Sequence, residues 1–137
     1  MSLRQILILY GCTALVMLPL DVAWLGTMGR TFYKEQLGGL LLDKPALLPA
    51  LAFYLLYAAG VVFFAVIPAV REQSLATALL NGAVLGLIAY ATYDLSNMAT
   101  LKGFTTAVGL VDLAWGTVLT ALTATGATLL GRWFGAA

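Results

Sequence analysis

The polar chemistry of this chain is concentrated in the stretch YDLSNMATLKGF, residues 93–104. The preceding segment, 75–93, carries no charge, and then Asp94, Asn97 and Lys102 follow within nine positions. A carboxyl group, an amide and an ammonium group together supply hydrogen-bond acceptors, donors and a group that can transfer a proton. The stretch therefore has the residue types needed to hold the polar end of a ligand, with an aspartate as acid or base.

Two further aspartates occur in matching contexts, LDVAW and VDLAW, in which Asp21 and Asp112 each precede a tryptophan, Trp24 or Trp115, by three residues. Residues three apart lie on one face of a helix. An aspartate among apolar helices is costly and usually faces the bundle interior or a wet cavity. Three such carboxyl groups cannot all stay ionised without compensation. We therefore expect protonation of at least one, pairing with Lys102, or a bound cation.

The composition determines where these residues must lie. Of the 137 residues, 62% are hydrophobic and only 9% are charged, whereas a soluble domain carries about a quarter charged residues. The chain is thus expected to be an integral membrane protein. Its net charge of +1 excludes a nucleic-acid footprint. Because it has no histidine and one cysteine, it cannot build an imidazole triad, the usual zinc sites or a disulfide framework.

Four segments are apolar over the roughly 20 residues that a helix needs to cross a membrane: about 5–28, 46–70, 75–97 and 106–131. The first continues beyond the apolar region of a signal peptide, so we interpret it as a retained helix. None alternates polar and apolar residues as membrane strands do. Short connections between the later spans predict antiparallel hairpins. The expected fold is an all-α antiparallel bundle of four transmembrane helices, with residues 1–137 as one domain.

The connection between the first two spans, 29–45, is longer and mixes leucines and aromatic residues with charges. This composition favours a short interfacial helix broken at Gly38-Gly39 over a plain solvated loop. On the third span, Gly82 and Gly86 form a small-xxx-small pair, which allows a neighbouring helix to approach closely.

The topology brings the polar residues to one membrane face. The first and third spans run in the same direction and the fourth begins where the third ends, so Asp21, Asp94 and Asp112 are expected on the same side. The asparagine, the lysine and both tryptophans belong to that side too. Tryptophans near helix ends more often anchor a protein at the membrane interface than stack on a ligand, and both roles stay open. For Tyr54 and Tyr57 on the second span, we favour ordinary packing over a place in the same cavity.

Longer stretches of the chain resemble a known family. YATYDLSNMATLKGF and VDLAWGTVLT, together with LPLDVAWLG and FYLLYAAGVVFFAVIPA, closely resemble the bacterial membrane proteins grouped as domain of unknown function 2177. The resemblance covers essentially the whole chain, with Ser96 where threonine is expected. It implies a small four-helix protein of the bacterial inner membrane and a link to lipid, because relatives are often encoded near lipid-modifying enzymes. The family motif maps onto Asp21, Trp24, Tyr93, Asp94, Asn97, Thr100, Lys102, Asp112, Trp115 and Gly116.

Three functions are compatible with these residues. The leading hypothesis is binding or modification of a lipid-like amphiphile, whose polar end meets Asn97 and Lys102 while an aspartate acts as acid or base. The second is an accessory or assembly subunit of a larger membrane complex, and the third is a small transporter or proton relay that works as an oligomer. No cofactor is evident; magnesium would suit oxygen ligands, but no metal motif supports it. The expected partners are membrane lipid, an amphiphilic small molecule, and a second copy or another membrane protein.

Overall fold

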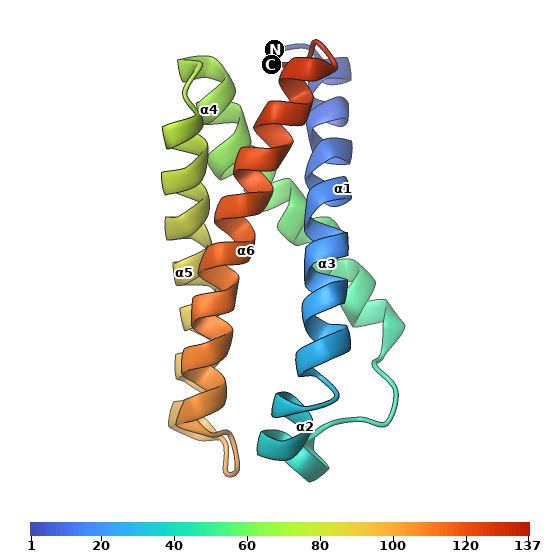
Figure 1. The fold of residues 1–137 in the computed structure, drawn as a ribbon, viewed down its shortest axis with the longest axis vertical. Coiled ribbons are helices and arrows are strands. Elements are labelled where there is room, and N and C mark those ends of the chain that lie inside the picture. Colours follow the sequence, from blue (N-terminus) through green and yellow to red (C-terminus); the bar gives the residue numbers. More distant parts are fainter.

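A computed structural model describes all 137 residues and contains only helices as regular structure. Four helices are long and apolar enough to cross a membrane (Figure 1). Three of the spans are single helices: α1, Leu3–Met28; α5, Leu75–Thr100; and α6, Thr106–Trp133. The second span combines α3, Leu47–Val61, a π-helical segment, Val62–Val66, and α4, Ile67–Glu72. The expected all-α bundle with four spans is therefore confirmed.

The two chain ends lie together at one end of the bundle, while α2 and the α5–α6 turn lie at the other (Figure 1). α2, Phe32–Leu37, is the short helix expected between the first two spans, and it passes into a single 3₁₀ turn, Gly38–Leu40. Gly38 has a φ of +48°, which glycine adopts more readily than a residue with a side chain. The chain can therefore change direction at Gly38, and α2 stays next to the end of α1 that carries Asp21.

Side-chain caps fix where three of the spans begin. The Ser2 hydroxyl accepts from the backbone N–H of Gln5 (3.2 Å), and the Gln5 side chain accepts from the backbone N–H of Ser2 (2.8 Å). Ser74 and Thr105 accept in the same way at the starts of α5 and α6. A cap of this kind typically contributes about 1 kcal/mol. Each cap therefore fixes the residue at which its helix begins.

α5 and α6 pack closely because glycines lie at their contact. A Cβ atom added at Gly82 or Gly86 would collide with α6, at the backbone of Thr120 and Gly116 respectively. A side chain at Gly116 would in turn collide with the ring of Tyr90 on α5. The small-residue pair is thus a close helix contact of the kind common in membranes. This contact fixes the rotation of the two helices that carry Asp94 and Asp112.

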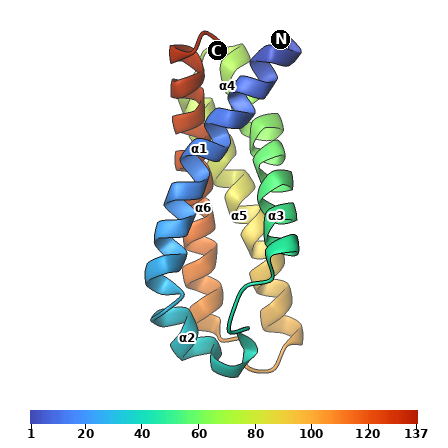
Figure 2. The same ribbon diagram turned by 90° about the vertical axis from the view of Figure 1, so that its right-hand side faces the viewer.

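The second span bends in its middle. Pro68 has no N–H, so the carbonyl of Phe64, four residues earlier, loses its ordinary helix hydrogen bond. The side chain of Asn81 on α5 donates to this carbonyl instead (3.2 Å). Prolines and π-helical segments are the usual causes of helix kinks. On the α3 side of the bend, the span runs obliquely away from α5, towards the end that holds α2 (Figure 1; Figure 2).

Candidate functional site

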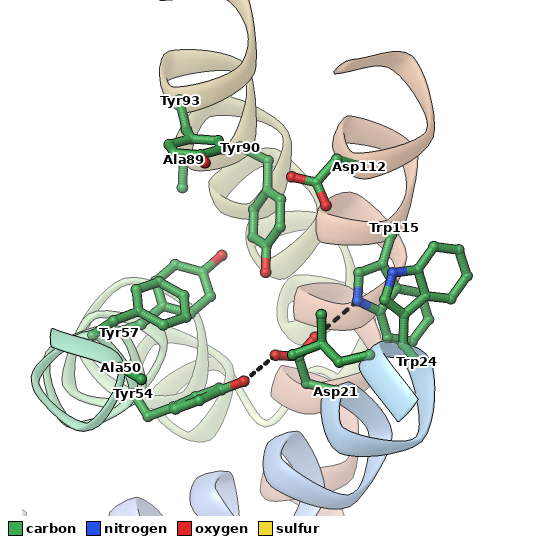
Figure 3. A pocket seen from close by; sticks show the side chains of 12 residues that line it. Asp21, Trp24, Ala50, Tyr54, Tyr57, Ala89, Tyr90, Tyr93, Asp112 and Trp115 are labelled. Carbon is green, nitrogen blue, oxygen red and sulfur yellow. Dashed lines mark hydrogen bonds between the residues drawn. The ribbon is translucent and has the colours of Figure 1, made fainter. Parts of the chain in front are cut away.

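Asp21 is the centre of one hydrogen-bonded cluster. It lies near the end of α1 and is only 5% exposed. Trp115 of α6 donates from Nε1 to its Oδ1 atom (3.0 Å), and the hydroxyl of Tyr54 on α3 donates to Oδ2 (Figure 3). Each oxygen therefore has one donor, which suits an ionised carboxylate because that group can only accept. The cluster connects three of the four spans at one point.

The two D-x-A-W segments interlock. The indole rings of Trp24 and Trp115 stack with their centroids 4.3 Å apart and their planes 3° apart. Trp115 bonds to Asp21, the aspartate of the other segment. Trp24 reaches the other aspartate through one intermediate, because its Nε1 donates to the hydroxyl of Tyr33 (3.1 Å), which donates to Asp112 Oδ1 (2.7 Å). The repeated sequence thus builds a reciprocal contact between α1 and α6.

Tyr33 attaches α2 to this contact. Burial raises the pKa of the Tyr33 hydroxyl well above its ordinary value, and its hydrogen bond to Asp112 raises the pKa further. The hydroxyl therefore keeps its proton at neutral pH and remains a donor to the carboxylate. A second bond, from the Thr105 hydroxyl to the side chain of Gln36 (3.1 Å), holds the same short helix against the start of α6.

Replacing Tyr33 with phenylalanine is expected to loosen α2, because the variant keeps the ring but loses both hydrogen bonds. Removing a hydrogen bond to a charged acceptor typically costs about 1.5–3 kcal/mol, so the amides of α2 should exchange with deuterium roughly ten to a hundred times faster. Hydrogen-exchange mass spectrometry in nanodiscs measures this rate. Tyr10→Phe, which loses a bond to the Leu55 carbonyl (2.9 Å), should leave α2 unchanged. Unaltered exchange in Tyr33→Phe would contradict the anchoring role.

Asp94 is fully buried, and neither of its oxygens has a hydrogen-bond donor within the protein. Its carboxyl group lies beside that of Asp112 on the facing helix. A buried polar group without a partner is costly, so a proton, a water molecule or a ligand must satisfy it. Lys102 does not, because it is exposed in the turn after α5. The hydrogen bonds to the aspartates of this site come from two tyrosines and a tryptophan, so the pair with Lys102, one of the three alternatives expected from the sequence, is not formed.

A cavity of about 490 Å³ lies between α1, α3, α5 and α6 (Figure 3). Its walls are mostly apolar and aromatic, with two carboxyl groups among them. The lining residues are Asp21, Trp24, Leu25, Ala50, Phe53, Tyr54, Tyr57, Ala89, Tyr90, Tyr93, Asp112 and Trp115. We call this the first cavity. It combines a hydrocarbon-like surface with a polar cluster inside the membrane-spanning part of the protein.

A second cavity, of about 740 Å³, adjoins the first on the side of α2. The two share Leu25, Tyr93 and Asp112 as lining residues. The second is more polar, and its walls include Arg30 and Asp43 from the connection between the first two spans. Around neither cavity does the chain gather three or more aspartate, glutamate or cysteine side chains that could hold a metal ion.

The family model of predicted membrane proteins named DUF2177 matches residues 6–129, which include most of all four spans and both D-x-A-W segments. The chain belongs to the DUF2177 family. The resemblance seen in the sequence is thereby confirmed, and the family description agrees with the four apolar helices. No curated protein and no solved structure matches the chain.

The structure of this DUF2177 protein brings together only part of the set of residues expected from its sequence. Five of them line the first cavity: Asp21, Trp24, Tyr93, Asp112 and Trp115. Asp94 is buried beside Asp112 without reaching the cavity wall. The other three line neither cavity; they lie on the last turn of α5 or in the turn beyond it: Asn97, Thr100 and Lys102.

Four further tyrosines complete the site of the DUF2177 protein, and none of them was among the site residues predicted from the sequence. The preference for ordinary packing of Tyr54 and Tyr57 was wrong, since both line the first cavity and Tyr54 bonds to Asp21. Tyr57 shares a hydrogen bond with Thr120 (2.7 Å). Tyr33 and Tyr90 are the other two. The available signal was the residue type itself, because a buried tyrosine hydroxyl usually finds a polar partner.

Proposed function

We propose that this DUF2177 protein binds a lipid-like amphiphile in the first cavity, as a multi-pass protein of the bacterial inner membrane. The observation that carries the proposal is a cavity of about 490 Å³ with apolar walls and two carboxyl groups, set among membrane-spanning helices. Ligand pockets commonly have volumes of roughly 300–1,000 Å³ and a few well-placed polar groups. The apolar walls suit a hydrocarbon chain, and the polar cluster suits the polar end of the same molecule.

The rim of the cavity favours a ligand that arrives from the bilayer. Phe53 on α3 and Tyr93 on α5 line the cavity, yet they are 44% and 60% exposed. Because the outer surface of a membrane bundle faces lipid, an amphiphile can reach such a rim sideways without leaving the bilayer. The oblique course of α3 separates this part of the second span from α5 (Figure 1).

The polar residues have different roles in this proposal. Asp21 is a positioning residue, because its two oxygens already accept from Tyr54 and Trp115 and hold both side chains on the cavity wall. Asp112 has a single side-chain donor, Tyr33, and is the carboxyl group available to a ligand. Binding needs only the cavity and this acceptor. A reaction at the polar end would use Asp112 as its acid or base.

The proposal predicts that filling the cavity displaces the amphiphile. Ala50 lines the first cavity, whereas Ala52 is exposed on the same helix and lines neither cavity. Ala50→Phe is therefore expected to lose bound amphiphile, and Ala52→Phe is the matched control. Overpacking typically costs about 1–3 kcal/mol, which corresponds to a loss of affinity of about fivefold to a hundredfold. Native mass spectrometry of protein extracted gently from its own membranes measures retention.

Two results would contradict the proposed function. One is equal retention of the amphiphile in Ala50→Phe and Ala52→Phe, because occupancy would then not depend on the cavity. The other is a stoichiometric protein partner with no amphiphile bound to the wild type. That result would make the chain an accessory subunit of a larger membrane complex.

A further inference from the structure

The first cavity holds acidic groups and no basic one. Its twelve lining residues include Asp21 and Asp112 but neither lysine nor arginine. Asp94 adds a third carboxyl group behind Asp112. Arg30 lines only the second cavity, where Asp43 accompanies it. A negatively charged group in the first cavity would thus face carboxyl groups at short range in a surrounding that screens repulsion weakly.

Most hydrogen-bond donors on the wall of the first cavity already donate to other groups of the protein. The tyrosine and tryptophan that bond to Asp21 are used there, and Tyr57 shares its hydroxyl bond with Thr120 (2.7 Å). What remains for a ligand is the second oxygen of Asp112, the hydroxyl of Tyr93 and the hydroxyl of Tyr90, which points into the cavity (Figure 3). A carboxylate oxygen accepts, and a tyrosine hydroxyl can accept as well as donate. The free groups therefore match a ligand that donates hydrogen bonds.

On the basis of the proposed function, we infer that the polar end of the amphiphile is a hydrogen-bond donor without negative charge, an alcohol or an amine. Its O–H or N–H group donates to Asp112 and meets the hydroxyl of Tyr90. An ammonium group would also balance the charge of the neighbouring carboxylates, whereas an alcohol would use hydrogen bonding alone. A fatty-acid carboxylate has no hydrogen to donate and is repelled by the same aspartates.

The test uses the Trp133→Phe variant in nanodiscs. Trp133 is 82% exposed at the opposite end of α6, and its removal leaves Trp24 and Trp115, both on the cavity wall, as the fluorescent reporters. Dodecylamine, dodecanol and laurate are titrated separately at neutral pH. The amine or the alcohol is expected to change the emission at a mole fraction about tenfold or more below that of laurate, because like charges in contact are strongly disfavoured.

Matched variants assign any response to the cavity. Ala50→Phe should remove the response and Ala52→Phe should keep it. Asp112→Asn should lose most of the discrimination against laurate, whereas Glu72→Gln, at the other end of the bundle, should retain it. A response to the amine alone points to an ammonium group, a response to the alcohol alone points to a hydroxyl group, and a response to both shows that either donor is accepted; each of these results supports the inference.

The contrary results separate the inference from the proposed function. If laurate binds as tightly as the other two probes and Ala50→Phe blocks it, the inference is overturned while the proposed function stands. If no probe gives a response that Ala50→Phe removes, both are overturned.

Discussion

Replacing Asp21 with alanine is expected to lower the free energy of unfolding by about 2–4 kcal/mol, because two donors lose a shared charged acceptor. Trp115 and Tyr54 would both be left without their partner in the bundle interior. Three spans meet at this carboxyl group, so no other contact replaces it directly. Unfolding of the purified protein in mixed micelles, followed by circular dichroism, measures the change.

Two further variants show whether the loss arises from these bonds. Asp21→Asn offers an acceptor to one donor but turns its NH₂ group towards the other, so an intermediate loss is expected. In Asp21→Ala combined with Tyr54→Phe, the two losses should be less than additive, since the variants remove the same bond. A single-variant loss below about 0.5 kcal/mol, the size of an ordinary surface effect, would contradict the central position of Asp21.

Replacing Gly86 with valine is expected to cost about 3 kcal/mol or to prevent folding, because side chains forced into a tight contact move the backbone. A Cβ atom at this position would meet the backbone oxygen of Gly116 and the side chain of Thr120. The separation of α5 and α6 would increase, and the carboxyl groups of Asp94 and Asp112 would move apart with the helices. Thermal unfolding in detergent, with the yield of monodisperse protein, reports both outcomes.

Gly11→Val is the matched control for this change. Gly11 lies within α1 at an exposed position, and a Cβ atom added there meets no other atom within 4 Å. The control introduces the same β-branched residue into a membrane span without a helix contact. Equal stability of Gly86→Val and Gly11→Val would show that the α5–α6 contact does not depend on glycine.

The sequence predicts the number and direction of the spans well, because both depend on the length of apolar runs and of connections. The four helices, the short helix α2 and the glycine contact on α5 follow from such local features. The common membrane face of Asp21, Asp94 and Asp112 follows from span order alone. All of these features depend only on the order, length and composition of segments along the sequence.

The arrangement of the polar side chains at that membrane face depends on how deep each residue lies in the membrane and on how each helix is rotated about its axis. The sequence gives little information on either. Lys102 shares a membrane side with Asp94, but Asp94 lies six residues before the end of α5, about 9 Å deeper at 1.5 Å per residue. Span order could not reveal this difference in depth. Nearly every residue around Tyr54 is apolar, so no polar stripe indicated which side of α3 faces Asp21.

The sequence also did not predict the reciprocal contact between the two D-x-A-W segments. The spacing of three placed Asp21 with Trp24, and Asp112 with Trp115, on common helix faces. It did not show that each tryptophan is linked by hydrogen bonds to the aspartate of the other helix, because that depends on how α1 and α6 cross. Tyr33, which completes one of the two links, comes from a connection in which only a short interfacial helix was expected.

The most direct test of an amphiphile in the first cavity is photo-crosslinking in native membranes. A diazirine analogue of leucine, close in shape to the natural residue, is placed at Leu25, which is 46% exposed and lines both cavities, or at Leu15, which is 63% exposed on the same helix and lines neither cavity. Mass spectrometry identifies what each position captures. The proposed function predicts one amphiphile enriched at Leu25 and the bulk phospholipid mixture at Leu15. The same phospholipid mixture at both positions would contradict it.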